Sequence, residues 1–233
     1  MTAELEPDDA YLRPGRFIDS GHPDVAAFAA RAAAGAEGPR ETAVRLYYAV
    51  RDQILYDPYM AFDELDTYRA SAVVALGRGY CVGKAALLAA AARAQGIAAR
   101  IAFADVRNHL ATPQLIELTG GGLFIYHGIA ELRLAGAWVK ATPTFNLTLC
   151  EKFGIKPLEF DGRTDAILHP YDREGRRHME YVHEHGAFAD VPVETLIRAM
   201  RAAYPRLDDF KRGQRGDFAR EAEALGRGVR GPA

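Results

Sequence analysis

The chain has 233 residues, of which 49% are hydrophobic and 26% are charged, and its formal net charge is −2. These values are typical of a folded globular protein and exclude disorder, collagen and coiled-coil arrays. The near-neutral charge gives no bulk attraction to nucleic acid, so no nucleic-acid partner is expected. Cys81 and Cys150 are the only cysteines, too few for a disulfide framework, which indicates a reducing compartment.

The sequence shows no recognisable targeting or membrane-spanning segment. Residues 1–10 are acidic where a signal peptide would be basic, and they contain no apolar run. The longest apolar stretch, residues 85–104, is interrupted by Arg93, Gln95 and Arg100, which is incompatible with a membrane span. We therefore expect a cytoplasmic protein without a membrane partner. Its preference for Ala and Arg over Lys is typical of a GC-rich bacterial genome.

Helices are predicted throughout the first part of the chain. Apolar residues at helical spacing, bounded by Gly and Pro, predict helices over residues 23–34, 41–56 and 71–76. A long alanine-rich helix follows, beginning near Tyr80 or Cys81 and running to Gln95, with Gly96 as its C-terminal stop.

Strands are predicted after Gly96, where the apolar period changes. Residues 97–106, 123–134 and 137–142 read as strands, and a two-residue turn joins the last two into a hairpin. Residues 108–122 read as a long loop. Helices followed by antiparallel strands indicate the α+β class.

The remainder of the chain is predicted to be less regular. Residues 157–174 read as loop, 191–203 as a helix, 207–226 as a charged final helix and 228–233 as a frayed tail. No repeat or domain linker is visible, so residues 1–233 are expected to form a single domain; the oligomeric state is not predicted.

The segment from Gly77 to Lys84 is the strongest candidate for chemistry. It places Cys81 after two glycines at the first turn of a helix, where unpaired N–H groups and the helix dipole stabilise a thiolate. The same N–H groups would stabilise an oxyanion formed when the sulfur attacks a carbonyl. The alternative is that Cys81 is a small buried hydrophobic residue that happens to begin a helix.

The predicted hairpin supplies a histidine. If it is symmetric about its turn, Ala135-Gly136, then His127 lies opposite Thr144, and Ile129 lies opposite Thr142. Three side chains that would orient the imidazole share its face: Thr142, Thr144 and Asn146.

Two further residues bear on the same hairpin. Pro143 must disturb a regular ladder because it has no N–H. Glu131 falls opposite Lys140, where a cross-strand salt bridge is preferred to a catalytic role.

These segments resemble the three motifs of the transglutaminase-like superfamily. The similarity rests on Gly79-Tyr80-Cys81 with the helix after it, on His127-Gly128-Ile129-Ala130-Glu131, and on Gly136 to Thr144 in that order. It covers about residues 41–149 and implies a papain-like α+β core, with the nucleophile helix packed on an antiparallel sheet. Extra helices would flank this core at both ends, with residues 150–233 forming a C-terminal helical extension.

The resemblance also implies roles for individual residues. Cys81 would be the nucleophile, His127 the base and then the acid, and Thr142 the third catalytic residue. The family commonly has an aspartate at the position of Thr142 and an aromatic residue at that of Ile129. A threonine hydroxyl accepts a hydrogen bond from the imidazole but adds no charge, and papain-like enzymes manage with a neutral asparagine.

The expected function is acyl transfer on a peptide or protein amide through a thioester on Cys81. Hydrolysis by a cysteine protease or amidase is favoured over transglutamination because no acidic calcium loop is present, and no cofactor or metal is expected. The competing class is a catalytically silent binding domain that kept the fold, which Thr142 in place of aspartate would suggest.

Three other groups have weaker claims. Asn108 and His109 follow a predicted strand and either line the substrate cleft or make ordinary loop hydrogen bonds. Cys150 reads as structural, with a disulfide to Cys81 left open. The aromatic residues before the cysteine motif are read as core packing rather than a substrate groove: Tyr56, Tyr59, Phe62 and Tyr68.

A histidine-rich segment suggests a metal. His178, His183 and His185 are dense enough for zinc, but their spacing fits no helical zinc motif and lacks cysteine partners. A solvated or interface segment is the preferred interpretation.

Overall fold

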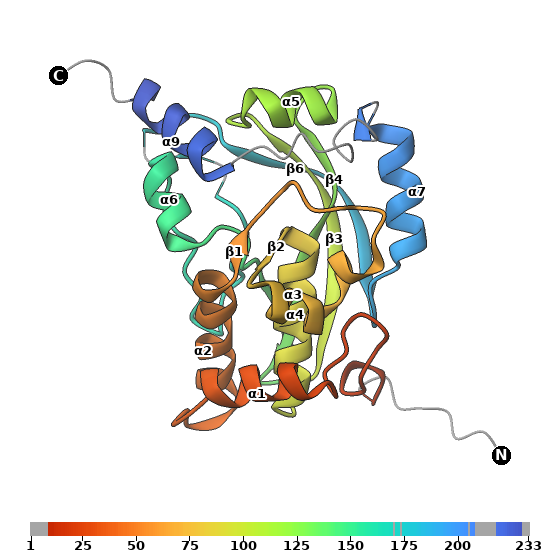
Figure 1. Ribbon diagram of the computed structural model, residues 1–233. Coiled ribbons are helices and arrows are strands. Elements are labelled where there is room, and N and C mark those ends of the chain that lie inside the picture. The colour runs from red at the N-terminus through yellow and green to blue at the C-terminus, as the bar shows by residue number, and fades with distance from the viewer. Residues whose placement is uncertain (1–8, 170, 173, 205, 208–217, 230–233) are drawn as a thin grey trace.

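The computed structural model describes residues 9–169, 171–172, 174–204, 206–207 and 218–229. Helices and an antiparallel sheet form its core, as expected for the α+β class (Figure 1). No helix within the described ranges is both long enough and apolar enough to cross a membrane.

The main sheet has four antiparallel strands in the order β5-β4-β3-β6. They are β3 (Ala99–Asn108), β4 (Leu123–Leu134), β5 (Ala137–Ala141) and β6 (Met179–Phe188). A small parallel pair, β1 (Leu55–Tyr56) and β2 (Arg78–Gly79), lies just before the cysteine helix.

The helices surround the sheet at its face and ends (Figure 1). The α-helices are α1 (Pro23–Ala32), α2 (Gly38–Gln53), α3 (Ala70–Leu76), α4 (Cys81–Ala94), α5 (Pro113–Thr119), α6 (Leu147–Phe153), α7 (Val193–Ala203) and α9 (Phe218–Val229). Two 3₁₀ turns, η1 (Asp9–Tyr11) and η2 (Leu65–Tyr68), complete them.

Helix α4 is the centre of the core. Its residues from Val82 to Arg93 are all buried, because α1, α2 and α3 pack on one side of it and β3 and β4 on the other. A helix that is apolar all round belongs in such a position, and its alanines let the neighbouring elements approach closely. This is the predicted nucleophile helix packed on an antiparallel sheet.

Two buried basic side chains, Lys84 and Arg93, tie α4 to its surroundings. The Lys84 Nζ donates to the carbonyls of Arg51 at 2.9 Å and Ile54 at 2.5 Å, which satisfies the end of α2. Arg93 donates to the carbonyls of Ala99 and, across the molecule, of Ala189 after β6. Both ends of the cysteine helix are therefore fixed by hydrogen bonds as well as by packing.

The hairpin register is confirmed, but only along β5. Ala130 pairs with Ala141 and Leu134 with Ala137, as predicted. The predicted pairing of His127 with Thr144 is wrong because the ladder ends at Ala141. Beyond it, the Thr142 N–H donates to the Ala166 carbonyl at 3.0 Å, and Pro143 has no N–H to offer.

The predicted salt bridge of Glu131 has a different partner. Glu131 lies opposite Lys140 in the ladder, but its carboxylate pairs with Arg100 of β3 at 2.6 Å. Lys140 pairs instead with Glu184 of β6 at 3.2 Å. The bridge is therefore cross-strand, to the other neighbour of β4.

Besides the short elements β1, β2, η1 and η2, the structure has three longer elements that the sequence patterns did not predict. Helix α5 interrupts the predicted loop 108–122, α6 follows the hairpin, and β6 pairs with β3 at the edge of the main sheet. Residues 150–233 therefore supply a strand of the sheet as well as helices. The predicted helix 191–203 is present as α7, whereas 208–217 and 230–233 lie outside the described residues.

Candidate active site

Cys81 is the first residue of α4, as predicted. Gly77 ends α3 in the left-handed conformation, with φ of 63°, and the short strand β2 leads from it to the cap residue Tyr80. The first hydrogen bond within α4 runs from the Lys84 N–H to the Tyr80 carbonyl at 3.0 Å. The N–H groups of the first turn, including that of Cys81, therefore have no acceptor within the helix.

The Cys81 thiol is held in its neutral form. Burial raises its pKa to about 11, although the N–H groups of Gly128, Val82 and Cys81 itself lower it. The expected stabilised thiolate is thus not the resting state, because desolvation outweighs the three hydrogen bonds and the helix end. Those N–H groups remain directed at the place where negative charge would develop during attack.

His127 lies in β4 opposite Ala104 of β3, and its ring is buried. Burial lowers the pKa of His127 to about 4. The imidazole is therefore neutral near pH 7 and able to accept a proton. Its Nε2 has no hydrogen-bond partner among the residues that the structure describes.

Gly128 sets the distance between the histidine strand and the cysteine helix. A Cβ at this position would lie 2.8 Å from the Val82 Cα and 3.3 Å from the Cys81 carbonyl oxygen. Only glycine allows β4 to approach the first turn of α4 so closely. The sequence carries a signal for this contact, since glycine inside a strand pattern indicates a close backbone approach.

A β-bulge fixes the backbone just before His127. Asp105 of β3 is skipped in the pairing with β4, and its Oδ1 accepts the Tyr126 N–H at 3.0 Å. The same oxygen contacts His185 Nε2 at 2.6 Å, and the His185 ring stacks on Tyr126 at 3.9 Å between centroids. These contacts hold Tyr126 at φ of 52°, a conformation that non-glycine residues rarely adopt.

Cys81 and His127 line the same narrow cavity, of about 40 Å³, together with Thr144. The Thr144 Oγ1 is buried and, like His127 Nε2, has no hydrogen-bond partner among the described residues. The structure thus brings a thiol, a neutral imidazole and an unsatisfied hydroxyl to one place.

Thr142 and Asn146 are placed elsewhere. Thr142 lines a neighbouring cavity beside Cys150, which shares Phe145 and Leu168 with the narrow one. Its Oγ1, like that of Thr144, is buried and has no hydrogen-bond partner among the described residues. The Asn146 amide is engaged, since it accepts the Tyr56 N–H at 3.1 Å and donates to Thr148 at 2.7 Å.

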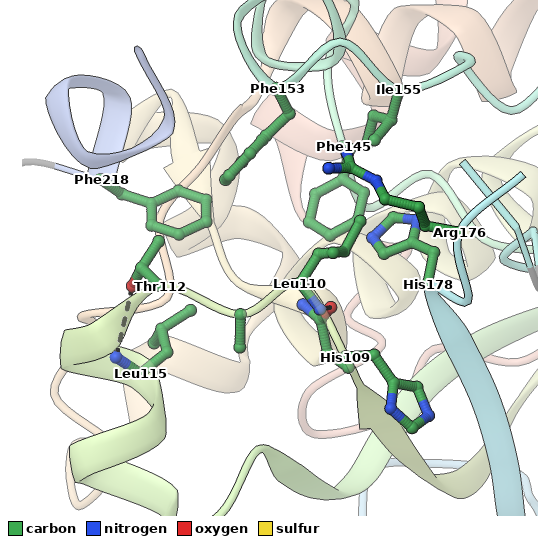
Figure 2. Close-up of a pocket in the computed structure, with 12 residues that line it drawn as sticks. His109, Leu110, Thr112, Leu115, Phe145, Phe153, Ile155, Arg176, His178 and Phe218 are labelled. Carbon is green, nitrogen blue, oxygen red and sulfur yellow. Dashed lines mark hydrogen bonds between the residues drawn. The ribbon is translucent and has the colours of Figure 1, made fainter. Parts of the chain in front are cut away.

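A larger cavity, of about 270 Å³, adjoins the narrow one. Figure 2 shows the residues that line it. The two share four lining residues: Asn108, Leu115, Phe145 and Phe218. Asn108 and His109 both line the larger cavity and also make local contacts: Asn108 Oδ1 accepts the Leu110 N–H at 2.9 Å, and His109 Nε2 contacts Glu180 at 3.1 Å. Phe145 and Phe218 carried no sequence signal because the elements that bring them here were not predicted or lie far along the chain.

The two cysteines differ as predicted. Cys150 is 1% exposed, and its thiol donates to the Phe145 carbonyl at 3.8 Å, whereas Cys81 is partly exposed. Neither forms a disulfide. Of the four aromatic residues, Phe62 and Tyr68 are in the core, and Tyr56 and Tyr59 are half-buried against it; Tyr56 also lines the narrow cavity.

The histidine-rich segment is largely the strand β6. His183 and His185 meet edge to face at 4.6 Å, and His185 also contacts Asp105. His178 lies apart from them, in the wall of the larger cavity. Over the described part of the chain, no group of three His, Cys, Asp or Glu side chains is arranged to hold a metal ion.

Comparison with known proteins gives one family. The model of the transglutaminase-like superfamily matches residues 26–143, which is just over half of the chain. No curated protein matches the sequence significantly. Among solved structures, a "Putative Cysteine Protease" from Cytophaga hutchinsonii is similar at 16% identity with a TM-score of 0.46. The alignment covers 79% of this chain and 55% of the other, so the chain spans about half of that protein's length.

Proposed function

The chain belongs to the transglutaminase-like superfamily, and on this premise we propose that it is an enzyme that transfers the acyl group of an amide or peptide to Cys81. The substrate is a peptide or protein, and the acceptor is water, which makes the enzyme a cysteine protease or amidase. Two cysteines without a disulfide suit a reducing cytoplasm.

The proposed reaction has two steps, each with a proton transfer through His127. In the first, the Cys81 sulfur bonds to the substrate carbonyl carbon, the thiol proton passes to His127, and His127 gives it to the departing amine as the C–N bond breaks. In the second, His127 takes a proton from water, whose oxygen displaces the sulfur and releases the acid. The proton then returns to the sulfur, which regenerates the thiol.

One observation carries the proposal: Cys81 and His127 line one cavity, and backbone N–H groups are directed at the sulfur. The N–H of Cys81 is at the start of α4, where no helical acceptor competes for it. Such a group stabilises the oxyanion of a tetrahedral intermediate. The raised pKa of the thiol and the lowered pKa of the imidazole favour general-base attack rather than a pre-formed ion pair.

Thr144 is our candidate for the residue that orients His127. It lines the same cavity, whereas Thr142, at the position that the family motif assigns to an aspartate, lines the neighbouring cavity and not that of His127. A hydroxyl accepts a hydrogen bond from the ring without adding charge, which suits an imidazole that is neutral at rest.

The test uses N-acetylglycine p-nitrophenyl ester, a reactive acyl donor, and follows release of p-nitrophenol. We expect turnover by the full chain, loss of turnover in Cys81→Ala, and turnover near that of the wild type in Cys150→Ala. His127→Ala should be slower by a factor of about 10² or more, the usual contribution of a general base.

The acceptor is identified in the same assay by adding methylamine. Release of free N-acetylglycine in the presence of the amine supports hydrolysis, whereas predominant formation of the N-methylamide would make the protein an amine acyltransferase. Suppose that the protein cleaves the ester no faster than the free thiol N-acetylcysteine does, and that Cys81→Ala cleaves it at the same rate as the wild type. This result would contradict the proposed enzymatic activity and favour the catalytically silent binding domain.

A further inference from the structure

The larger cavity opens directly beside the proposed nucleophile. It shares four wall residues with the narrow cavity of Cys81 and His127, so the two cavities adjoin. A group attached to the Cys81 sulfur therefore has a short path into the larger cavity. Its volume of about 270 Å³ well exceeds the ~150 Å³ of an engineered apolar cavity that accepts benzene.

The walls of this cavity are apolar and rich in aromatic rings. Figure 2 shows side chains from three separate parts of the chain around it: Leu110, Leu115, Phe145, Phe153, Ile155 and Phe218. Aromatic and aliphatic walls favour a flat apolar group, which gains both from burial and from ring contacts.

The charged residues at the cavity are already paired. Arg176 Nε donates to the Asp172 carboxylate at 2.7 Å, and His109 contacts Glu180 at 3.1 Å. The cavity therefore presents no unneutralised charge to an ionic ligand. A neutral occupant fits it better than an acidic or basic one.

His178 differs from the other polar residues of the cavity, whose side chains are already engaged in hydrogen bonds or ion pairs. The residue is 7% exposed, and its side chain makes no hydrogen bond with any other described residue. Burial lowers the pKa of His178 to about 4, so the ring is neutral and offers one donor and one acceptor. It lines the larger cavity and the cavity of Thr142 and Cys150, but not the narrow cavity of Cys81.

We propose that this cavity binds a neutral aromatic side chain that carries a hydroxyl group, as in tyrosine, with His178 as the hydrogen-bond partner of the hydroxyl. The side chain belongs to the acyl half of the substrate, the half that stays bonded to Cys81 in the thioester. This assignment of the acyl half rests on the proposed function. The fit of the aromatic ring rests on the cavity alone.

Most of the aromatic residues that line this cavity lie outside the part of the chain that the family model matches, so the proposed preference for an aromatic side chain does not come from the shared core. The family match ends at residue 143, whereas Phe145, Phe153, His178 and Phe218 all follow it. The part of the chain beyond the shared core thus supplies most of the aromatic surface and the polar partner.

The first experiment compares three alkylating substrate analogues, the chloromethyl ketones of N-acetyl-L-tyrosine, N-acetyl-L-phenylalanine and N-acetyl-L-alanine. We expect Cys81 to be alkylated at least about tenfold faster by the tyrosine compound than by the alanine compound, the usual effect of burying an aromatic side chain. Equal rates for the three compounds would overturn the proposed aromatic preference. If Cys81 were still the residue alkylated, its assignment as the nucleophile would stand.

Two variants locate the preference. Leu110→Trp fills the cavity and should bring the tyrosine-to-alanine ratio close to one. The matched control Ile116→Trp adds the same ring to an exposed position on α5, 46% exposed, and should leave the ratio unchanged. His178→Leu should lower the tyrosine-to-phenylalanine ratio about fivefold, the value of one hydrogen bond. A ratio unaffected by Leu110→Trp would show that the preference arises elsewhere.

A binding measurement separates this inference from the proposed chemistry. N-acetyl-L-tyrosinamide is titrated into the Cys81→Ala protein, with N-acetyl-L-alaninamide as the control, and binding is followed by NMR. Tighter binding of the tyrosine amide supports the cavity even if no reagent ever modifies Cys81, which would defeat only the proposed reaction. No difference between the amides, together with equal alkylation rates, would defeat the inference while leaving the reaction standing.

Discussion

The protonation states of Cys81 and His127 determine the pH range in which the proposed enzyme works. The pKa of His127 is lowered to about 4, so the imidazole remains a base down to that pH, and the pKa of Cys81 is raised to about 11. We expect kcat/KM to be level through the neutral range and to fall by tenfold per pH unit only below about pH 4. A pH profile of amide hydrolysis tests this, and an acid limb near 6.5, the ordinary histidine value, would contradict it.

The third residue of the site is tested by two matched substitutions. Thr144→Val and Thr142→Val each remove one hydroxyl and keep the shape of the side chain. Because only Thr144 lines the cavity with His127, we expect Thr144→Val to lower kcat about tenfold with little change in KM, and Thr142→Val to have the smaller effect. A larger loss of kcat in Thr142→Val than in Thr144→Val would assign the orientation of His127 to Thr142.

Part of this site could be predicted from residues alone. The start of the helix at Cys81 and the strand that contains His127 could be predicted from local patterns. Glycines at helix ends and the spacing of apolar residues depend only on residues close together in the sequence. The neighbours of His127 did not follow. Pro143 ends the ladder, and the chain then turns toward Ala166, a contact that no local pattern encodes.

Among the elements, the contact between β4 and α4 is the most sensitive. A Cβ on Gly128 would come within 2.8 Å of the Val82 Cα, so Gly128→Ala must displace the strand from the helix. We expect it to cost about 1–3 kcal/mol of unfolding free energy and to reduce kcat/KM about 10²-fold, since a small misplacement of reacting groups has such effects. Urea unfolding and ester turnover measure the two quantities.

The control for this substitution lies on the same strand. Ile129→Val removes one buried methylene-sized group and should cost about 0.5–1.5 kcal/mol without moving β4 toward or away from α4. It should therefore retain most of the activity. If both variants lost activity in proportion to stability, the close approach at Gly128 would have no special role.

The elements that were not predicted share a physical cause. In β6, a run of His183, Glu184 and His185 interrupts the apolar residues, and the strand lies at the edge of the sheet with much of it facing solvent. Helix α5 is only seven residues long, too short for a clear apolar period. By contrast, α4 and β4 are long and buried, and their predicted bounds agree with the structure within a residue or two.

At the scale of the whole molecule, buried neutral histidines make the fold sensitive to acid. The pKa values of His127 and His178 are both lowered from 6.5 to about 4 in the folded protein. Between pH 6.5 and pH 4 these histidines are protonated in the unfolded chain but not in the folded chain. The stability that depends on them is therefore fully present above about pH 6.5 and is lost as the pH falls toward 4. Each histidine contributes on the order of 3 kcal/mol to this loss.

Urea unfolding across this pH range measures the effect. His178→Leu should make the unfolding free energy fall less steeply with decreasing pH than it does in the wild type. The difference between the two proteins removes the contribution of carboxylates, which both share. An unchanged slope would mean that His178 is protonated in the folded state as readily as in the unfolded chain.

The central claim is that Cys81 forms a thioester during turnover. The most direct measurement is peptide mapping by mass spectrometry after the protein is mixed with N-acetylglycine p-nitrophenyl ester and quenched in acid. The account predicts an N-acetylglycyl mass increase on the peptide that contains Cys81, which disappears after hydroxylamine treatment and persists longer in His127→Ala. No adduct at Cys81, or an equal adduct at Cys150, would contradict it.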